Sequence, residues 1–317
     1  MKVVIIGGVA GGATAAARIR RLDEKAEIVV FERSGFISYA NCGLPYYIGG
    51  TIEDEGDLTL QTPESFYKRF RVKMNVRHEV TALHPESKMV TVKNIENGTV
   101  FTETYDKLIL SPGAKPIKPN FEGIDSDKIF TLRTVEDTLK IKKFINEKYP
   151  KSAVVVGGGF IGIEVAENLR ELGIDVTLVE AADQLMAPFD SDMASFIHAE
   201  LRKNDVNLML GRFVEGFADT DDGICVKLKN SPTLHANMVV MAIGVAPETT
   251  LAKDAGLELG IKGSIVVNDR METSVTDIYA VGDAVQIRNF VTDTDALISL
   301  AGPANKQGRI IADNICG

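Results

Sequence analysis

The sequence lacks paired cysteines, long apolar runs and an excess of positive charge. Its three cysteines, Cys42, Cys225 and Cys316, are widely spaced and include no CxxC pair. This spacing excludes a secreted disulfide framework, and we expect a reducing, cytoplasmic setting. No stretch approaches the roughly 18 apolar residues of a membrane span. The net charge of −9 argues against a nucleic acid or a membrane surface as the main partner.

Metal-ligand spacing is also absent. The four histidines (His78, His84, His198 and His235) are scattered, and surface or packing roles suffice for them. The amino-terminal apolar run is too short for a signal peptide and breaks at glycines. The 317 residues, 45% apolar and 25% charged, are typical of a soluble protein with two domains.

One pattern occurs twice. Residues 2–22 and 152–172 each contain a β-branched run, a glycine cluster and a helical pattern rich in Ala, Leu and Arg. An apolar strand follows each and ends in an acid, Glu32 or Glu180. Strand, glycine turn, helix, strand and an acid about 20 residues on make a dinucleotide-binding βαβ unit. The two copies predict an α/β fold of two Rossmann-like domains that bind two different dinucleotides.

The second glycine loop, residues 157–162, contains the full G-x-G-x-x-G. Gly157 allows the tight turn, Gly159 lets a pyrophosphate approach the backbone, and Gly162 lets the helix pack on the strand. The phosphates then meet free N–H groups at the helix start. Glu180 can hold both ribose hydroxyls and would repel a 2′-phosphate, which favours NADH and leaves NADPH as an alternative.

The first glycine loop, residues 7–12, is less regular. Gly7 and Gly12 fit the motif, but Val9 stands at the middle position. A single match of this kind is weak, and the βαβ context with its acid is what supports it.

Apolar strands that return to glycines separate the two units. Residues 105–116 and 235–249 predict crossings between intercalated domains, and residues 273–285 contain a further strand that ends in Gly282-Asp283. Asp283 is either a helix N-cap or a carboxylate that takes a ribityl hydroxyl.

In residues 72–110, between the two repeated units, apolar and polar residues alternate with period two. This segment contains Asn97-Gly98, a hairpin signal, and predicts a small antiparallel β-meander. Residues 134–151 predict a surface helix.

With these motifs the whole chain resembles the flavin-dependent pyridine nucleotide–disulfide oxidoreductases. The resemblance implies that residues 1–113 and 246–317 bind FAD discontinuously and that residues 114–245 bind NADH. Within the FAD part it implies cofactor contacts from Gly7, Gly12, Glu32, Arg33, Asn41, Gly113 and Asp283. Within the NADH part it implies contacts from Gly157, Gly159, Phe160, Gly162, Glu164 and Glu180, with Phe160 gating the nicotinamide pocket and Glu164 lining it.

The segment SYANCGLPYYIGG, residues 38–50, resembles the single-cysteine branch of that family, most closely the coenzyme A-disulfide and CoA-persulfide reductases. Two-cysteine relatives carry a second cysteine three or five positions later, where this chain has Pro45 and Tyr47. Cys42 must therefore find its second sulfur in a substrate or oxidise to a sulfenic acid. The resemblance implies that electrons pass from NADH through FAD to a mixed disulfide between Cys42 and CoA.

Both routes need the thiolate, and an ordinary thiol is only about 3% ionised at pH 7. A short helical turn begun near Asn41 is expected to aim its N–H groups at the sulfur and, with nearby cations, to lower its pKa. For Cys225, in an alternating strand, a buried packing role is expected, and Cys316 is expected to be incidental.

Thr14, Arg18 and Arg21 fall on one helix face at spacings of four and three. From the residues alone this is a solvated basic stripe. The resemblance implies that these side chains, with Ser38 and Asn41, hold coenzyme A and its phosphates.

Two departures from the family keep alternatives open. NADH peroxidases and oxidases carry a histidine in the first glycine loop, where this chain has Ala10, so an oxidase or peroxidase that cycles through sulfenic acid is the alternative function. The family homodimer is expected, but its C-terminal dimerisation domain does not follow Gly317. We therefore expect a piece of a longer protein or one that works without that domain, and a catalytically silent flavoprotein is a further alternative.

Overall fold

The structure, a computed structural model, describes residues 1–317. Unit 1 comprises residues 1–39, 59–115 and 246–317, and unit 2 comprises residues 40–58 and 116–245. The sequence predicts that residues 40–58 belong to the first part, whereas in the structure they pack with unit 2. Leu44 and Ile48 are buried there, because their short helix packs against two helices of unit 2.

Unit 1 is built on a five-stranded parallel sheet in the order β19-β7-β1-β2-β3. Its central strands are β-branched and buried on both faces, as a parallel sheet covered by helices requires. The strands are β1 (Lys2–Ile6), β2 (Glu27–Phe31), β3 (Lys73–Asn75), β7 (Lys107–Leu110) and β19 (Ile278–Ala280).

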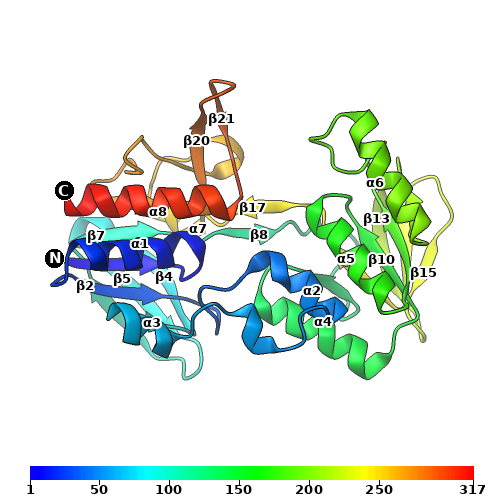
Figure 1. The fold of residues 1–317 in the computed structure, drawn as a ribbon, viewed down its shortest axis with the longest axis horizontal. Helices are drawn as coiled ribbons and strands as arrows, with labels where there is room; N and C mark the ends of the chain where they lie inside the picture. Colours follow the sequence, from blue (N-terminus) through cyan, green and yellow to red (C-terminus); the bar gives the residue numbers. More distant parts are fainter. The chain divides into compact units, whose positions relative to one another are not determined.

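The helices of unit 1 are α1 (Ala10–Leu22), α3 (Pro63–Phe70), α7 (Thr250–Asp254) and α8 (Ala301–Cys316). Helix α8, from the end of the chain, lies alongside α1 from its beginning (Figure 1). The two helices approach closely because Gly308 faces α1. A Cβ on Gly308 would lie 2.6 Å from the carbonyl oxygen of Gly11.

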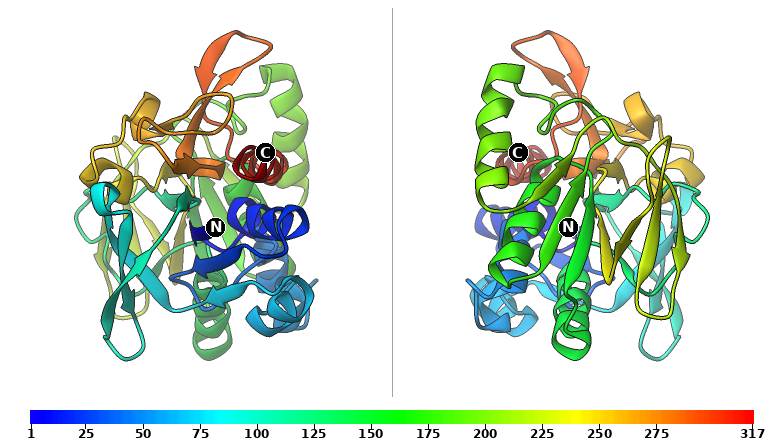
Figure 2. Two further views of the ribbon diagram at one scale, coloured as in Figure 1. Left: turned by 90° about the vertical axis from the view of Figure 1, so that its left-hand side faces the viewer. Right: turned by 90° about the vertical axis from the view of Figure 1, so that its right-hand side faces the viewer.

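The predicted meander is confirmed as an antiparallel sheet of β4 (His78–His84), β5 (Met89–Asn94) and β6 (Val100–Thr104) (Figure 2, left). The turn between β5 and β6 contains Asn97-Gly98, with Gly98 at φ 74°. A second small sheet in unit 1 consists of β18 (Ile265–Val266), β20 (Val285–Asn289) and β21 (Thr294–Ala296).

Unit 2 repeats the same parallel sheet, in the order β12-β11-β10-β16-β9. The strands are β9 (Ile129–Thr131), β10 (Ser152–Val156), β11 (Asp175–Val179), β12 (Asn207–Met209) and β16 (Met238–Met241). The helices are α2 (Leu44–Gly49), α4 (Val135–Lys148), α5 (Phe160–Glu171) and α6 (Ser191–Lys203). Helix α4 confirms the surface helix expected within residues 134–151, and a capping box between Thr134 and Asp137 starts it.

Unit 2 also holds a three-stranded antiparallel sheet that we did not predict. It consists of β13 (Val214–Asp219), β14 (Ile224–Leu228) and β15 (Leu234–Ala236) (Figure 2, right). At the crossings, β8 (Ala114–Pro116) pairs with β17 (Val245–Pro247). The two Rossmann-like sheets confirm the predicted α/β fold class. None of the helices has the length and apolar character needed to span a membrane.

Candidate functional site

The two glycine loops share one backbone arrangement. Gly7 and Gly157 have φ values of 98° and 108°, in the left-handed region that favours glycine. Each donates its N–H over 2.8 Å to the last residue of the next strand, Phe31 or Val179. The tight turn predicted for the first glycine is therefore present in both units.

The third glycine of each loop is required by packing. A Cβ on Gly12 would lie 2.0 Å from the carbonyl oxygen of Gly7, and one on Gly162 would lie 1.9 Å from that of Gly157. No side chain can be placed there unless the loop moves away from the helix.

The middle position differs between the loops. Gly159 has a φ of −83°, which any residue adopts, and no atom lies within 4 Å of a Cβ built on it. Neither backbone strain nor packing therefore requires glycine at this exposed position. Space for the close approach of a ligand is the remaining reason for the glycine. The N-cap residues, Val9 of α1 and Gly159 of α5, make no side-chain cap bond. In α1 the Ser111 hydroxyl accepts the N–H of Gly12 over 3.1 Å, so the N–H groups before Gly12 can meet a phosphate there.

Each acid at the end of the second strand holds its own glycine loop. Its carboxylate accepts hydrogen bonds from the N–H of the glycine directly after the first one, Gly8 or Gly158, and from the N–H of the residue two positions after the acid. The bonds run from Gly8 (2.8 Å) and Ser34 (2.9 Å) to Glu32, and from Gly158 (2.6 Å) and Ala182 (2.7 Å) to Glu180. Glu32 is buried and Glu180 half-buried.

Cys42 lies exposed in a 3₁₀ turn, Asn41–Gly43, that leads directly into α2. The short helical turn that we predicted from Asn41 is confirmed. The Asn41 side chain donates to the carbonyl oxygen of Arg133 over 3.4 Å. All three cysteines are free, so Cys42 has no disulfide partner.

The expected N–H groups around the sulfur are used elsewhere. Gly43 donates its N–H to the carbonyl oxygen of Ala40 over 2.9 Å, and Leu44 donates to that of Asn41. Pro45 has no N–H. The prediction that these residues aim their N–H groups at the sulfur is therefore wrong, because the turn satisfies them internally.

The face of α5 that meets α2 is acidic. Burial, and then the Glu167 carboxylate, raise the pKa of Glu164. Burial is also the largest cause that raises the pKa of Tyr46, followed by the carboxylates of Glu167, Glu164 and Glu171. The Tyr46 phenol therefore stays protonated and can donate a hydrogen bond next to these acids.

A family model described as pyridine nucleotide-disulphide oxidoreductase matches residues 1–308. The chain belongs to this family. A coenzyme A disulfide reductase from Staphylococcus aureus (strain JH9) is 39% identical over 316 residues, which are 100% of this chain and 70% of that protein.

Solved structures of other members are similar over the whole chain. Reduced Bacillus anthracis CoADR-RHD is 50% identical with a TM-score of 0.97, and this chain spans 57% of it. A NAD-dependent persulfide reductase from A. fulgidus is 37% identical with a TM-score of 0.95, and 59% of its length is covered. A water-forming NADH oxidase from Lactobacillus brevis is 33% identical with a TM-score of 0.93; the match covers 99% of this chain and 69% of the oxidase.

Membership of this oxidoreductase family implies FAD and NAD(P)H as cofactors. The chain fits both groups, since each unit has a tight glycine turn, a helix start whose N-cap residue makes no side-chain cap bond, and an acid at the end of the second strand. The open space at Gly159 is where a pyrophosphate would meet the second loop.

Four further residues predicted to contact cofactors lie beside these loops or at strand ends. Phe160, the first residue of α5, is 62% exposed. Arg33, next to Glu32, is also exposed. Gly113, at φ 71°, accepts the N–H of Glu248 over 3.0 Å. Asp283 lies within a 3₁₀ turn, Gly282–Ala284, and therefore does not cap a helix.

The predicted coenzyme A residues on α1 are already engaged within unit 1. The Thr14 hydroxyl donates to Asn305 over 2.8 Å, and the Arg18 guanidinium pairs with Asp313 over 2.8 Å, both on α8. Arg21 lies over the Phe70 ring, 5.7 Å from its centre.

Ser38 adopts a φ of 47°, donates its N–H to the carbonyl oxygen of Gly8 over 3.0 Å and accepts that of Leu60 over 3.0 Å. Ser38 therefore ties the loop that follows β2 to the first glycine loop within unit 1.

Cys225 does not have the predicted packing role. Ile224, Val226 and Leu228 point into the core, so the alternation of β14 turns Cys225 to the opposite, partly exposed face. There its sulfur lies 3.3 Å from Nδ1 of His235 on the neighbouring strand. Cys316 is half-buried at the end of α8.

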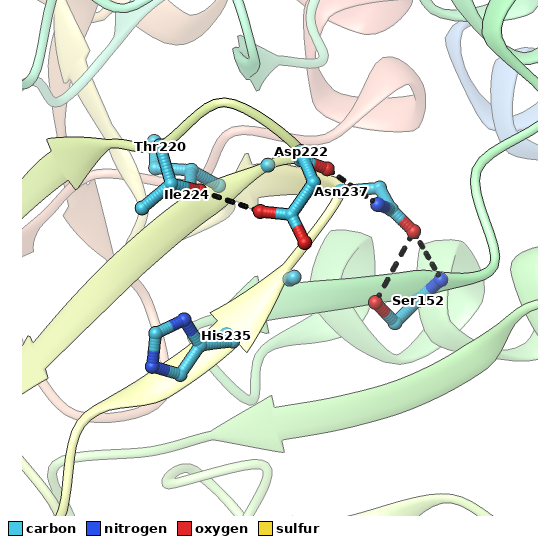
Figure 3. A pocket seen from close by; sticks show the side chains of 8 residues that line it. Ser152, Thr220, Asp222, Ile224, His235 and Asn237 are labelled. Carbon is cyan, nitrogen blue, oxygen red and sulfur yellow. Dashed lines mark hydrogen bonds between the residues drawn. The ribbon is translucent and has the colours of Figure 1, made fainter.

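A small cavity of about 110 Å³ adjoins this sheet and is lined by Ser152, Thr220, Asp222, His235 and Asn237, among others (Figure 3). The Asn237 carboxamide accepts the backbone N–H and hydroxyl of Ser152 and donates to the Asp222 carbonyl oxygen. These polar groups bind one another, and the cavity is too small for a nucleotide, which needs a pocket of at least about 300 Å³. No group of three or more His, Cys, Asp or Glu side chains in the chain is placed to hold a metal ion.

Proposed function

We propose that this chain is a NADH-dependent flavoenzyme that reduces coenzyme A disulfide or CoA persulfide through Cys42. The observation that carries the proposal is a free, exposed cysteine at the start of a short helix, in a member of a disulfide oxidoreductase family. The similarity to a coenzyme A disulfide reductase and to a persulfide reductase supports the substrate class.

The glycine loops and acids support the distribution of the two nucleotides. Unit 1 would hold FAD through Gly7, Gly12 and Glu32, with Arg33, Gly113 and Asp283 as further contacts. Asn41, the remaining predicted FAD contact, belongs to unit 2. Unit 2 would hold NADH through Gly157, Gly159, Gly162 and Glu180, with Phe160 and Glu164 beside the nicotinamide. Glu180 favours NADH because a 2′-phosphate would meet a second negative charge.

The chain's own chemistry is that of a single thiolate. The Cys42 thiolate attacks one sulfur of CoA disulfide, forms a Cys42–S–S–CoA bond and releases one CoA thiolate, which takes a proton from solvent. FAD, when bound, supplies the two-electron relay from NADH. Two electrons then cleave the mixed disulfide, which releases the second CoA thiolate and restores that of Cys42.

Thr14, Arg18, Arg21, Ser38 and Asn41 are the proposed contacts to the coenzyme A moiety. Arg18 can form charge-assisted hydrogen bonds with a phosphate. It must first exchange its bond with Asp313 for the phosphate, and both side chains are exposed enough for this exchange.

Replacement of Cys42 tests the proposal. Cys42→Ser should abolish NADH-dependent turnover of CoA disulfide, because the attack on the disulfide needs the thiolate. The rate at which NADH reduces FAD should stay within about twofold of the parent's, because hydride transfer does not need the thiolate. Cys225→Ser is the matched control and should retain turnover. Unchanged turnover in Cys42→Ser would refute the proposal.

An NADH oxidase is the second candidate, because the water-forming oxidase from Lactobacillus brevis is 33% identical. Cys42 would then cycle through a sulfenic acid. Ala10, at the start of α1, offers no imidazole for acid–base chemistry. Rapid oxygen consumption with no CoA disulfide turnover would favour this candidate. If NADH fails to bleach the flavin under anaerobic conditions, the chain is a silent flavoprotein.

A further inference from the structure

The helix that follows Cys42 is too short to be stable alone. Helix α2 has six residues, whereas isolated helices need roughly 12 to 15 to form in water. Its position, and with it that of the Cys42 turn at its start, must therefore come from the contacts of α2 with its neighbours.

The carbonyl groups at the end of α2 receive unusual partners. A helix leaves its last four carbonyls without partners inside the helix. That of Tyr46 accepts the N–H groups of Gly50 and Ile52 over 3.0 and 3.1 Å. Those of Tyr47 and Ile48 accept hydrogen bonds from the ammonium group of Lys142, on α4, over 3.0 and 2.8 Å.

Lys142 also lies over the Tyr47 ring, with its nitrogen 5.5 Å from the ring centre. The ammonium group of Lys142, on α4, thus contacts two consecutive carbonyl groups of α2 and the aromatic ring of Tyr47 on the same helix. A positive charge is favourable at this end of a helix.

The other side of α2 is fixed by α5. A Cβ on Gly49 would lie 2.1 Å from Oδ1 of Asn168, so the two helices are in direct contact here. Asn168 is buried, and its Oδ1 has no hydrogen-bond partner. Since α5 begins at the second glycine loop, α2 connects that loop's helix to the Cys42 turn within unit 2.

We propose that Lys142 is a positioning residue for Cys42: it ties the end of α2 to α4 and so fixes the turn that carries the thiol. The expected effect of Lys142 on turnover rests on the proposed function of Cys42, whereas its expected effect on the stability of α2 does not. Lys142 contacts neither substrate nor cofactor in this account.

The test compares Lys142→Met, Lys142→Arg and the matched control Lys143→Met in the FAD-loaded protein. Lys143 is the next residue of α4 and pairs only with Glu147 at the surface. Hydrogen exchange of residues 44–50 should be at least tenfold faster in Lys142→Met and unchanged in the control. The kcat for CoA disulfide should fall about tenfold with KM within twofold, and Lys142→Arg, which retains the charge and donors, should recover most of it.

Unchanged exchange in residues 44–50, or faster exchange with unchanged kcat, would overturn the proposal. If Lys142→Met does not fold, Lys142→Gln replaces it as the test. Glutamine keeps an uncharged NH₂ donor group, so the same effects should appear at a smaller size, and their absence overturns the proposal equally. If the parent protein does not turn over CoA disulfide, the proposed function fails instead. The rate of Cys42 alkylation by iodoacetamide, followed by peptide mass spectrometry, then decides: a fivefold change in Lys142→Met supports the positioning role, and an unchanged rate refutes it.

Discussion

The two glycine loops differ in how far the rest of their own unit covers them. In unit 1, Val9 and Ala10 at the start of α1 are half-buried, and α8 packs so closely on α1 that Gly308 has no room for a side chain. In unit 2, Gly159 is exposed with no atom within 4 Å of a Cβ, and Phe160 is 62% exposed.

The backbone bonds of the loops are nevertheless the same. Each first glycine has a positive φ and donates a 2.8 Å hydrogen bond to the next strand. Each acid accepts the N–H of the glycine directly after the first one, Gly8 or Gly158. The shared bonds therefore define the nucleotide-binding motif, while the surroundings set access to it. On the proposed function, the more covered loop of unit 1 would hold resident FAD, and the more open loop of unit 2 would hold NADH, which exchanges at every turnover.

Substitution of the third glycine should break each loop separately and have the largest effect. A Cβ at Gly12 or Gly162 would overlap a backbone carbonyl oxygen at 2.0 or 1.9 Å, which costs about 3 kcal/mol or more. We expect Gly12→Ala to lose FAD on gel filtration, and Gly162→Ala to retain FAD but to lose at least 100-fold in NADH-dependent flavin reduction. Loss of FAD from both variants would show that the loops are not independent.

Substitution of Gly159, the middle glycine of the second loop, tests whether the open space there serves a ligand. Gly159→Val copies the residue of the first loop, Val9, into the second. Because nothing in the chain occupies that space, the melting temperature should change by less than about 2 °C. A side chain there would obstruct a pyrophosphate, and KM for NADH should rise about tenfold, equivalent to about 1.4 kcal/mol. An unchanged KM would mean that no ligand approaches Gly159; Val9→Gly is the reciprocal control and should retain FAD.

Acidification should affect the second loop only, and by the smallest amount. His198 on α6 accepts the N–H of Leu185 over 3.0 Å, and this tethers the segment after Glu180. Burial, and then Arg202, lower the pKa of His198 from 6.5. The folded state therefore favours neutral His198, so its contribution to stability is complete above pH 6.5 and is lost as the pH falls through the lowered pKa.

We accordingly expect KM for NADH to rise two- to threefold between about pH 7.5 and 5.5, while FAD stays bound. In His198→Phe, which cannot accept the bond, KM should be raised at all pH values and should vary less. Equal pH dependence in both proteins would contradict this role of His198.

The sequence predicted those parts of the site that depend on local geometry. Gly7, Gly157 and their strands follow from spacing alone, and the turn at Cys42 was expected from its position before a short helix. The packing of residues 40–58 in unit 2 was not predicted, because it depends on contacts with α4 and α5, which are distant in the sequence.

Two failures have different physical causes. Cys225 and Lys227 alternate with Ile224 and Val226, and this alternation with apolar residues places Cys225 on the outer face of β14. Lys142 had no such signal, because it is one of several lysines in its helix and only the position of α2 distinguishes it.

The most direct test of the account is mass spectrometry of the FAD-loaded protein after incubation with CoA disulfide. A mixed disulfide should add about 765 Da to the peptide that contains Cys42, and NADH should remove it under anaerobic conditions. Absence of the adduct, or an adduct on Cys225 alone, would contradict the claim that Cys42 takes its second sulfur from coenzyme A.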